Sequence, residues 1–193
     1  MQLVLGSSSP YRKALLEKLG LPFECFSPEI DELAEPGEPP RQLVERLAIE
    51  KARETGKAYP KALIIGSDQV AVLDDKIIGK PASHEDAVNQ LKEASGREVH
   101  LYTGLCLYNA NTGNIQHSVE SYSVVFRDLN EAQIEQYLKK DQPYNCAGSL
   151  KAETLGIAML SKLEGEDPNT LIGLPLIRLV DMLLEEGIDP ILV

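Results

Sequence analysis

Near its N-terminus the sequence reads Leu3-Val4-Leu5-Gly6-Ser7-Ser8-Ser9-Pro10-Tyr11-Arg12. The apolar run Leu3–Leu5 predicts a short buried strand. Ser9 followed by Pro10 is typical of a helix N-cap with proline at the first helical position. A second strand is predicted over 22–26, so the chain begins with a β-α-β pattern, which favours an α/β fold.

The same stretch is a candidate anion site. Free backbone N–H groups and the helix dipole at such a helix start attract anions. The hydroxyls of Ser7 and Ser8 add hydrogen-bond donors, and the guanidinium of Arg12 can bind a phosphate in a bidentate manner. The alternative interpretation is an ordinary capped helix, which spacing alone slightly favours because Ser-Pro helix starts are common.

The rest of the chain mixes helices and strands. The patterns predict helices over 41–56, 83–96, 130–140 and 174–186, and strands over 62–65, 70–73, 98–109, 115–127 and 156–160. The strands over 98–109 and 115–127 flank a turn sequence and read as an antiparallel hairpin. An early β-α-β pattern followed by a long hairpin predicts an α/β sheet of mixed direction.

Composition limits the classes of function. The 193 residues suffice for one domain or two small lobes, and the net charge is −11. So acidic a chain is a poor binder of polymeric nucleic acid or of anionic membranes. Three cysteines without a Cys-x-x-Cys pair support neither a disulfide framework nor a zinc ribbon. The N-terminus has no basic, apolar leader, and we expect a cytoplasmic protein without a membrane span.

Two acidic stretches are candidates for catalysis or metal binding. Gly66-Ser67-Asp68-Gln69 is predicted to end an apolar strand, where α/β sheets bind ligands. Asp68 there can hold Mg²⁺ or act as a general base, and the alternative is an aspartate in a turn. Glu29-Ile30-Asp31-Glu32 can complete a site of oxygen ligands, although an acidic solvated loop is the simpler interpretation.

Two lysines stand in unusual settings. Lys80 lies between Gly79 and Pro81, and Lys51 lies among apolar residues of a predicted helix. Lys51 either extends its stem along the apolar surface to water or points at a phosphate. The chain has no Walker A sequence, G-x-G-x-x-G, H-E-x-x-H or G-x-S-x-G, and its three histidines lack metal-ligand spacing.

Seven short motifs follow one another along the chain: Ser7-Ser8-Ser9-Pro10-x-Arg12, Glu29-Ile30-Asp31-Glu32, Glu50-Lys51-Ala52, Ser67-Asp68-Gln69, Gly79-Lys80-Pro81, Thr103-Gly104 and Ala147-Gly148. As a set they resemble the Maf family of nucleoside triphosphate pyrophosphatases over essentially the whole chain. Tyr11, Cys146–Ser149 and Asp167–Pro175 look most like its YceF-like branch, whose members hydrolyse 7-methyl-GTP. The branch with a second arginine in place of Tyr11 prefers dTTP and UTP.

The resemblance implies a fold, a cofactor and an assembly. The fold is a mixed elongated sheet with flanking helices and a central cleft, like that of the inosine-triphosphate pyrophosphatases. Residues 1–193 then form a single domain with two lobes around the cleft. The resemblance also implies a divalent metal cation, Mg²⁺ or Mn²⁺, and a homodimer. The reaction is nucleoside triphosphate plus water giving the monophosphate and pyrophosphate.

The resemblance also implies roles for particular residues. Asp68 accepts a proton from the attacking water and binds the metal. Glu32 is the second catalytic residue and supports the metal or the water. The triphosphate is held by Ser7, Ser8, Arg12, Lys51 and Lys80. Base specificity is set by Tyr11, Gln69 and Glu153. Two alternatives remain open, a dTTP/UTP pyrophosphatase of the same family and a nucleotide-binding regulator of cell division without turnover.

Overall fold

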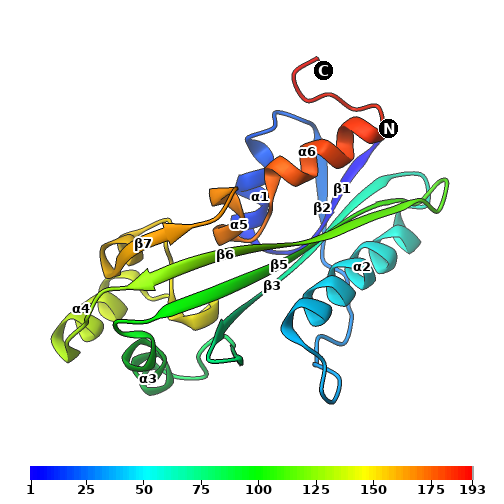
Figure 1. Cartoon of the computed structure of the whole chain (residues 1–193). Coiled ribbons are helices and arrows are strands. Elements are labelled where there is room, and N and C mark those ends of the chain that lie inside the picture. Colours follow the sequence, from blue (N-terminus) through cyan, green and yellow to red (C-terminus); the bar gives the residue numbers. More distant parts are fainter. Residues whose placement is uncertain (193) are drawn as a thin grey trace. The chain divides into compact units, whose positions relative to one another are not determined.

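The computed structural model describes residues 1–192, which form two compact units. Unit 1 comprises Met1–Gln69, Thr103–Glu120 and the chain from Asp167 onward. Unit 2 comprises Val70–Tyr102 and Ser121–Glu166. Three strands, β3, β5 and β6, begin in one unit and end in the other (Figure 1).

The strands form one seven-stranded sheet. Its order is β2 (Phe23–Phe26), β1 (Leu3–Gly6), β3 (Leu63–Leu73), β5 (Glu98–Asn109), β6 (Ile115–Phe126) and β7 (Leu160–Glu164), with β4 (Lys76–Ile78) paired to β3. Strand β1 is parallel to β2 and β3, whereas β4 and β7 are antiparallel to their partners β3 and β6. The predicted α/β class with a sheet of mixed direction and flanking helices is therefore confirmed.

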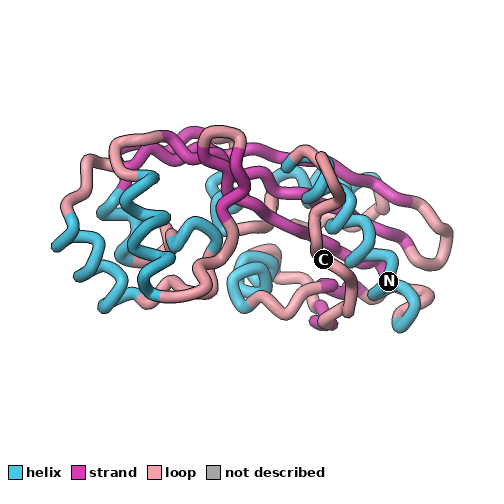
Figure 2. The backbone as a smooth tube through the Cα atoms, turned by 90° about the horizontal axis from the view of Figure 1, so that it is seen from below, coloured by secondary structure: helices cyan, strands magenta, loops and turns pink. Residues whose placement is uncertain are grey.

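Unit 1 has three layers because successive side chains of a strand point to opposite faces. Leu3 and Leu5 of β1 pack with buried leucines of α1 (Pro10–Glu17) and α6 (Leu176–Glu185). Val4 packs on the other face with Ala48 and Ala52 of α2 (Pro40–Ala58). The helices therefore cover both faces of this part of the sheet (Figure 1). The start of β1 and the chain after α6 lie on the same side of unit 1 in both views (Figures 1 and 2).

Two glycines allow α2 to lie directly on the strands. A Cβ atom at Gly66 of β3 would stand 2.1 Å from the carbonyl oxygen of Ala48, and one at Gly104 of β5 would stand 2.0 Å from that of Val44. No side chain fits at those distances, so the close approach requires glycine at both positions. The approach brings Lys51, near the middle of α2, beside β3.

Unit 2 holds α3 (His84–Ala94) and α4 (Glu131–Asp141), which pack against each other. Short 3₁₀ turns over Ala147–Ser149 and Leu155–Met159 pack on α3 and α4, respectively. Ser83 and Asn130 cap the two helices, and each is the first residue of the range predicted for its helix. Among the helices of residues 1–192, none is long and apolar enough to cross a membrane.

Two predicted strand positions are wrong. Residues 156–159 belong to a 3₁₀ turn, and the strand begins only at Leu160. The buried residues there are Gly156 and Met159, whose spacing of three matches the 3₁₀ turn rather than a strand. Ser67–Gln69 do not end a strand, because β3 continues unbroken to Leu73. The single domain with two lobes around a cleft stays a prediction.

Candidate active site

The hydroxyl groups after β1 shape the start of α1. Ser9 Oγ accepts a hydrogen bond from the backbone N–H of Arg12 at 3.4 Å, so the predicted N-cap is confirmed. The buried Ser7 accepts one through its Oγ from the backbone N–H of Ser9 at 3.1 Å. Ser8 is exposed. The turn between β1 and α1 is therefore fixed by its own serines, with Ser8 facing outward.

Arg12 is half-buried and anchored to a distant part of the chain. Its Nε donates to the carbonyl oxygen of Gly173 at 2.8 Å, and Ser67 Oγ donates to the same oxygen at 3.0 Å. Burial lowers the pKa of Arg12, while the negative charges of Asp68 and Glu32 act in the opposite direction. A guanidinium stays protonated under such a shift, so Arg12 is a fixed cation near two carboxylates.

The anchor for Arg12 is a single helical turn, α5 (Pro168–Ile172), that ends at Gly173 with φ of 118°. Gln69 of β3 donates through Nε2 to Thr103 Oγ1 at 2.8 Å and to the carbonyl oxygen of Thr170 at 2.7 Å. Thr103 of β5 also donates to that carbonyl, at 3.2 Å. Polar side chains of two strands therefore hold the turn that holds Arg12.

Asp167 is the residue that sequence reasoning missed at this turn. Its buried carboxylate accepts from the backbone N–H of Asn169 and from that of Ile177, both at 2.8 Å. One side chain thereby caps the starts of α5 and α6. The signal was present in the sequence, because Asp167-Pro168 has the same cap-plus-proline form as Ser9-Pro10.

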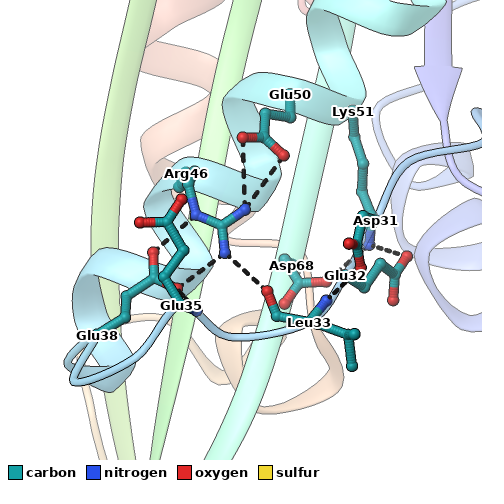
Figure 3. Close-up of polar contacts among 9 residues, drawn as sticks. All are labelled: Asp31, Glu32, Leu33, Glu35, Glu38, Arg46, Glu50, Lys51 and Asp68. Atoms are coloured by element: carbon teal, nitrogen blue, oxygen red, sulfur yellow. Dashed lines mark hydrogen bonds and ion pairs between the residues drawn. The ribbon is translucent and has the colours of Figure 1, made fainter.

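Asp68, Lys51 and Glu32 form one charged cluster in unit 1 (Figure 3). Lys51 Nζ lies 2.7 Å from Asp68 Oδ1 and 2.8 Å from Glu32 Oε1. The side chains of Lys51 and Asp68 are only 9% and 12% exposed, whereas that of Glu32 is 60% exposed. The ammonium group of Lys51 is therefore placed between two carboxylates, and it does not extend to open solvent.

Unit 1 thus brings together Arg12, Glu32, Lys51 and Asp68, with Ser7 in the turn before α1 and Gln69 in β3. Tyr11 is half-buried at the start of α1. Lys80 and Glu153 belong to unit 2 and are exposed. The segment that carries Lys80 is held at the carbonyl oxygen of Gly79, which accepts from Gly148 N–H at 3.1 Å and from Gln90 Nε2 at 3.3 Å. The predicted functional roles of these residues stay predictions.

The donors available for a metal ion are few. Within residues 1–192, no three His, Cys, Asp or Glu side chains are grouped so that they would hold a metal. Asp68 and Glu32 nevertheless each place a carboxylate oxygen beside the ammonium group of Lys51. Mg²⁺ is typically bound by one or two carboxylates together with substrate phosphates, so this donor set fits a metal that binds with its substrate.

Comparison with known proteins identifies the family. The family model described as "Maf-like protein" matches residues 2–186. The chain belongs to the Maf family. A relative from Colwellia psychrerythraea (strain 34H / ATCC BAA-681), named "7-methyl-GTP pyrophosphatase", is 56% identical over 187 residues, covering 97% of this chain and 94% of the relative. The Maf resemblance stated from the motifs is therefore confirmed.

Part of the chain is also similar to a solved structure. It is the structure of the Staphylococcus aureus Ham1 protein, which matches with a TM-score of 0.46 and 15% identity. The match covers 66% of this chain and 73% of Ham1. So distant a likeness carries no argument about the site, and the assignment to the Maf family stands on sequence.

Proposed function

We propose that this chain is a nucleoside triphosphate pyrophosphatase that hydrolyses 7-methyl-GTP to 7-methyl-GMP and pyrophosphate. Such an enzyme removes a modified nucleotide from the pool. The observation that carries the proposal is the 56% identity, over nearly the full length of both chains, to a Maf family relative named for this activity. The charged cluster of unit 1 supplies groups of the kind that the reaction needs. The expected homodimer and cytoplasmic location belong to the same proposal.

In the proposed mechanism, water attacks the α-phosphorus and pyrophosphate leaves. Asp68 accepts a proton from the attacking water as the general base. Lys51, 2.7 Å from Asp68 Oδ1, holds that carboxylate in one orientation. Arg12, Ser7 and Ser8 hold phosphate oxygens beside the start of α1. Lys80, exposed in unit 2, also binds phosphate.

The charge balance of the cluster supports a role for a divalent metal in the proposed reaction. Asp68 and Glu32 are balanced by Lys51 and Arg12, so the site has no surplus positive charge for a triphosphate. Asp68 and Glu32 would hold a divalent cation, Mg²⁺ or Mn²⁺. When bound, the cation supplies positive charge that stabilises the negative charge developing on the leaving pyrophosphate.

Specificity for the methylated base follows from its positive charge. Methylation at N7 makes guanine cationic, and an aromatic face such as that of Tyr11 attracts a cation by about 0.5–2 kcal/mol. Glu153 is the proposed carboxylate that accepts the N1–H and the exocyclic amine of guanine. The amide nitrogen of Gln69 already donates to Thr103 and Thr170, so a contact from Gln69 to the base uses its amide oxygen.

The experiment that tests the function measures pyrophosphate release from 7-methyl-GTP, GTP, dTTP and UTP with Mg²⁺ or Mn²⁺. We expect the highest kcat/KM for 7-methyl-GTP. A higher value for dTTP or UTP overturns the specificity and leaves the pyrophosphatase standing. Release that equals a no-enzyme blank with every nucleotide overturns the enzyme itself and favours a non-catalytic nucleotide-binding protein.

The base-recognition residues are tested by Tyr11→Ala and Glu153→Gln. Tyr11→Ala is expected to reduce the ratio of kcat/KM for 7-methyl-GTP to that for GTP by about two- to thirtyfold, the equivalent of the 0.5–2 kcal/mol attraction. Glu153→Gln is expected to reduce the same ratio, because an amide has no negative charge to attract the cationic base. Glu93→Gln, at an exposed position of α3, is the matched control and should leave the ratio unchanged. An equal loss for both nucleotides would show that the residue does not sense the methyl cation.

A further inference from the structure

Glu32 lies on a long loop that has no regular structure. Residues 27–39, between β2 and α2, contain neither helix nor strand. Loops of this length are mobile unless side chains tie them down. Glu32 itself is mostly exposed, and its ion pair with Lys51 is a single contact at 2.8 Å. An ion pair with one exposed partner contributes little free energy, so other contacts are needed to fix the position of Glu32.

Arg46 of α2 supplies such contacts (Figure 3). Its guanidinium binds the Glu38 carboxylate in a bidentate ion pair. Nε donates to Oε1 at 2.7 Å, and Nη2 donates to Oε2 at 2.8 Å. Nη2 also donates to the carbonyl oxygen of Leu33 at 3.1 Å, and Nη1 lies 3.3 Å from the nearer carboxylate oxygen of Glu50. Two nitrogens of the side chain, Nε and Nη2, thus hold the loop on α2, and the third, Nη1, pairs with Glu50 of the same helix. We call the set of Arg46, Glu38 and Leu33 the loop clamp.

The loop clamp acts on the residue next to Glu32. Leu33 follows Glu32 directly, and its carbonyl is fixed by Arg46. On the other side, Asp31 Oδ1 accepts from the backbone N–H of Leu33 at 3.0 Å, which closes a tight turn around Glu32. Lys51 lies on the same helix as Arg46, five residues further on. One rigid helix therefore carries both the anchor of the loop and the ammonium group that Glu32 meets.

Within the loop clamp, Arg46 and Glu38 form an ion pair whose two side chains both carry charge. The Glu38 side chain is only 8% exposed, and its hydrogen bonds from Arg46 lower the pKa of Glu38 to about 2. The same bonds raise the pKa of Arg46. Both groups therefore stay charged at neutral pH. A lysine keeps the charge but lacks the planar set of donors, so it cannot make the same contacts.

We infer that Arg46 is a positioning residue that fixes the loop so that Glu32 meets Lys51 and Asp68 in the geometry required for hydrolysis. The inference rests on the proposed function, because it takes Glu32 to support the hydrolytic step. Positioning is worth a great deal in catalysis, since a misplacement of about 1 Å costs on the order of 10² in rate.

The first test is Arg46→Met. We expect kcat for 7-methyl-GTP to fall about 10–100-fold, with a smaller change in KM. Arg46→Lys should recover less than a third of the lost activity, because charge alone does not hold the carbonyl of Leu33. Arg53→Met is the matched control, since Arg53 is exposed and lies two turns further along α2. Full recovery by lysine would overturn the inference in favour of a simple charge effect.

A double-variant comparison asks whether Arg46 acts through Glu32. In a Glu32→Gln background, Arg46→Met should cost less than about threefold, because the group that it positions is already lost. If the two losses multiply, Arg46 acts by another route and the inference is overturned.

A readout independent of activity separates this inference from the proposed function. Hydrogen exchange of the free protein over residues 31–38 should accelerate in Arg46→Met and in Arg46→Lys, and should stay unchanged in Arg53→Met. If the wild type hydrolyses no nucleotide, the proposed function fails while the exchange data still report on the clamp. If exchange in this loop is the same in Arg46→Met as in the wild type, the inference fails even for an active enzyme. Should Arg46→Met not fold, Glu38→Gln takes its place with the same expectations.

Discussion

Asp68→Asn is expected to lower kcat by about 10²–10⁴-fold without unfolding the protein, the usual cost of losing a general base. The amide has the same size as the carboxylate, so the packing within β3 is retained, and the Lys51 ammonium group keeps its ion pair with Glu32. An amide cannot accept a proton from water at neutral pH, and it is a weaker ligand for a divalent cation. The substitution removes the chemical step and keeps the phosphate-binding groups of α1.

The measurement is kcat with 7-methyl-GTP, together with nucleotide binding by calorimetry. Binding within about threefold of the wild type, combined with the large loss of turnover, would agree with the role assigned to Asp68. Asp75→Asn is the control, because Asp75 lies in the exposed turn after β3 with φ of 62°, which asparagine tolerates. Retention of more than about a third of the wild-type activity in Asp68→Asn contradicts the proposed role.

Local sequence signals predicted most of the elements of the fold. Ser9-Pro10, Ser83 and Asn130 each mark a helix start that the structure contains. Such signals work because a cap side chain bonds to a backbone N–H only two or three residues away. The 3₁₀ turn before β7 was missed because its pattern of buried residues is too short to separate from that of a strand.

The candidate site was less predictable, because its contacts join residues far apart in the sequence. The sequence singles out Asp68 and Lys51, but their ion pair depends on Gly66 allowing α2 to lie on β3. The resemblance assigns Gln69 to the base, but no sequence signal indicates that its amide nitrogen holds the carbonyl of Thr170, about a hundred residues later. No sequence motif singles out Arg46, since a lone arginine on a helix is most often a solvated residue. Only the folded chain shows that its partners are Glu38 and Leu33.

Lys51→Met is expected to destabilise the protein strongly. The side chains of Lys51 and Asp68 are both nearly buried, so removing the ammonium group leaves the Asp68 carboxylate without its hydrogen-bonded partner, and only the charge of Arg12 remains near it. Removing one partner of a buried pair typically costs about 3–5 kcal/mol in the free energy of unfolding. Glu32 adds little to this cost because most of its surface is hydrated. The free energy of unfolding at pH 7, measured with urea, should fall by about 3 kcal/mol, and pyrophosphate release should fall with it.

A second substitution that removes the charge of Asp68 tests whether this carboxylate causes the loss of stability in Lys51→Met. Adding Asp68→Asn to Lys51→Met should restore most of the lost stability, although activity stays absent, because no unpaired charge is then buried. Lys57→Met is the control on the same helix, where the side chain is 74% exposed and the expected loss is below about 0.5 kcal/mol. A loss below about 1 kcal/mol in Lys51→Met, or no recovery in the double variant, would mean that the Lys51–Asp68 pair does not stabilise the fold in this way.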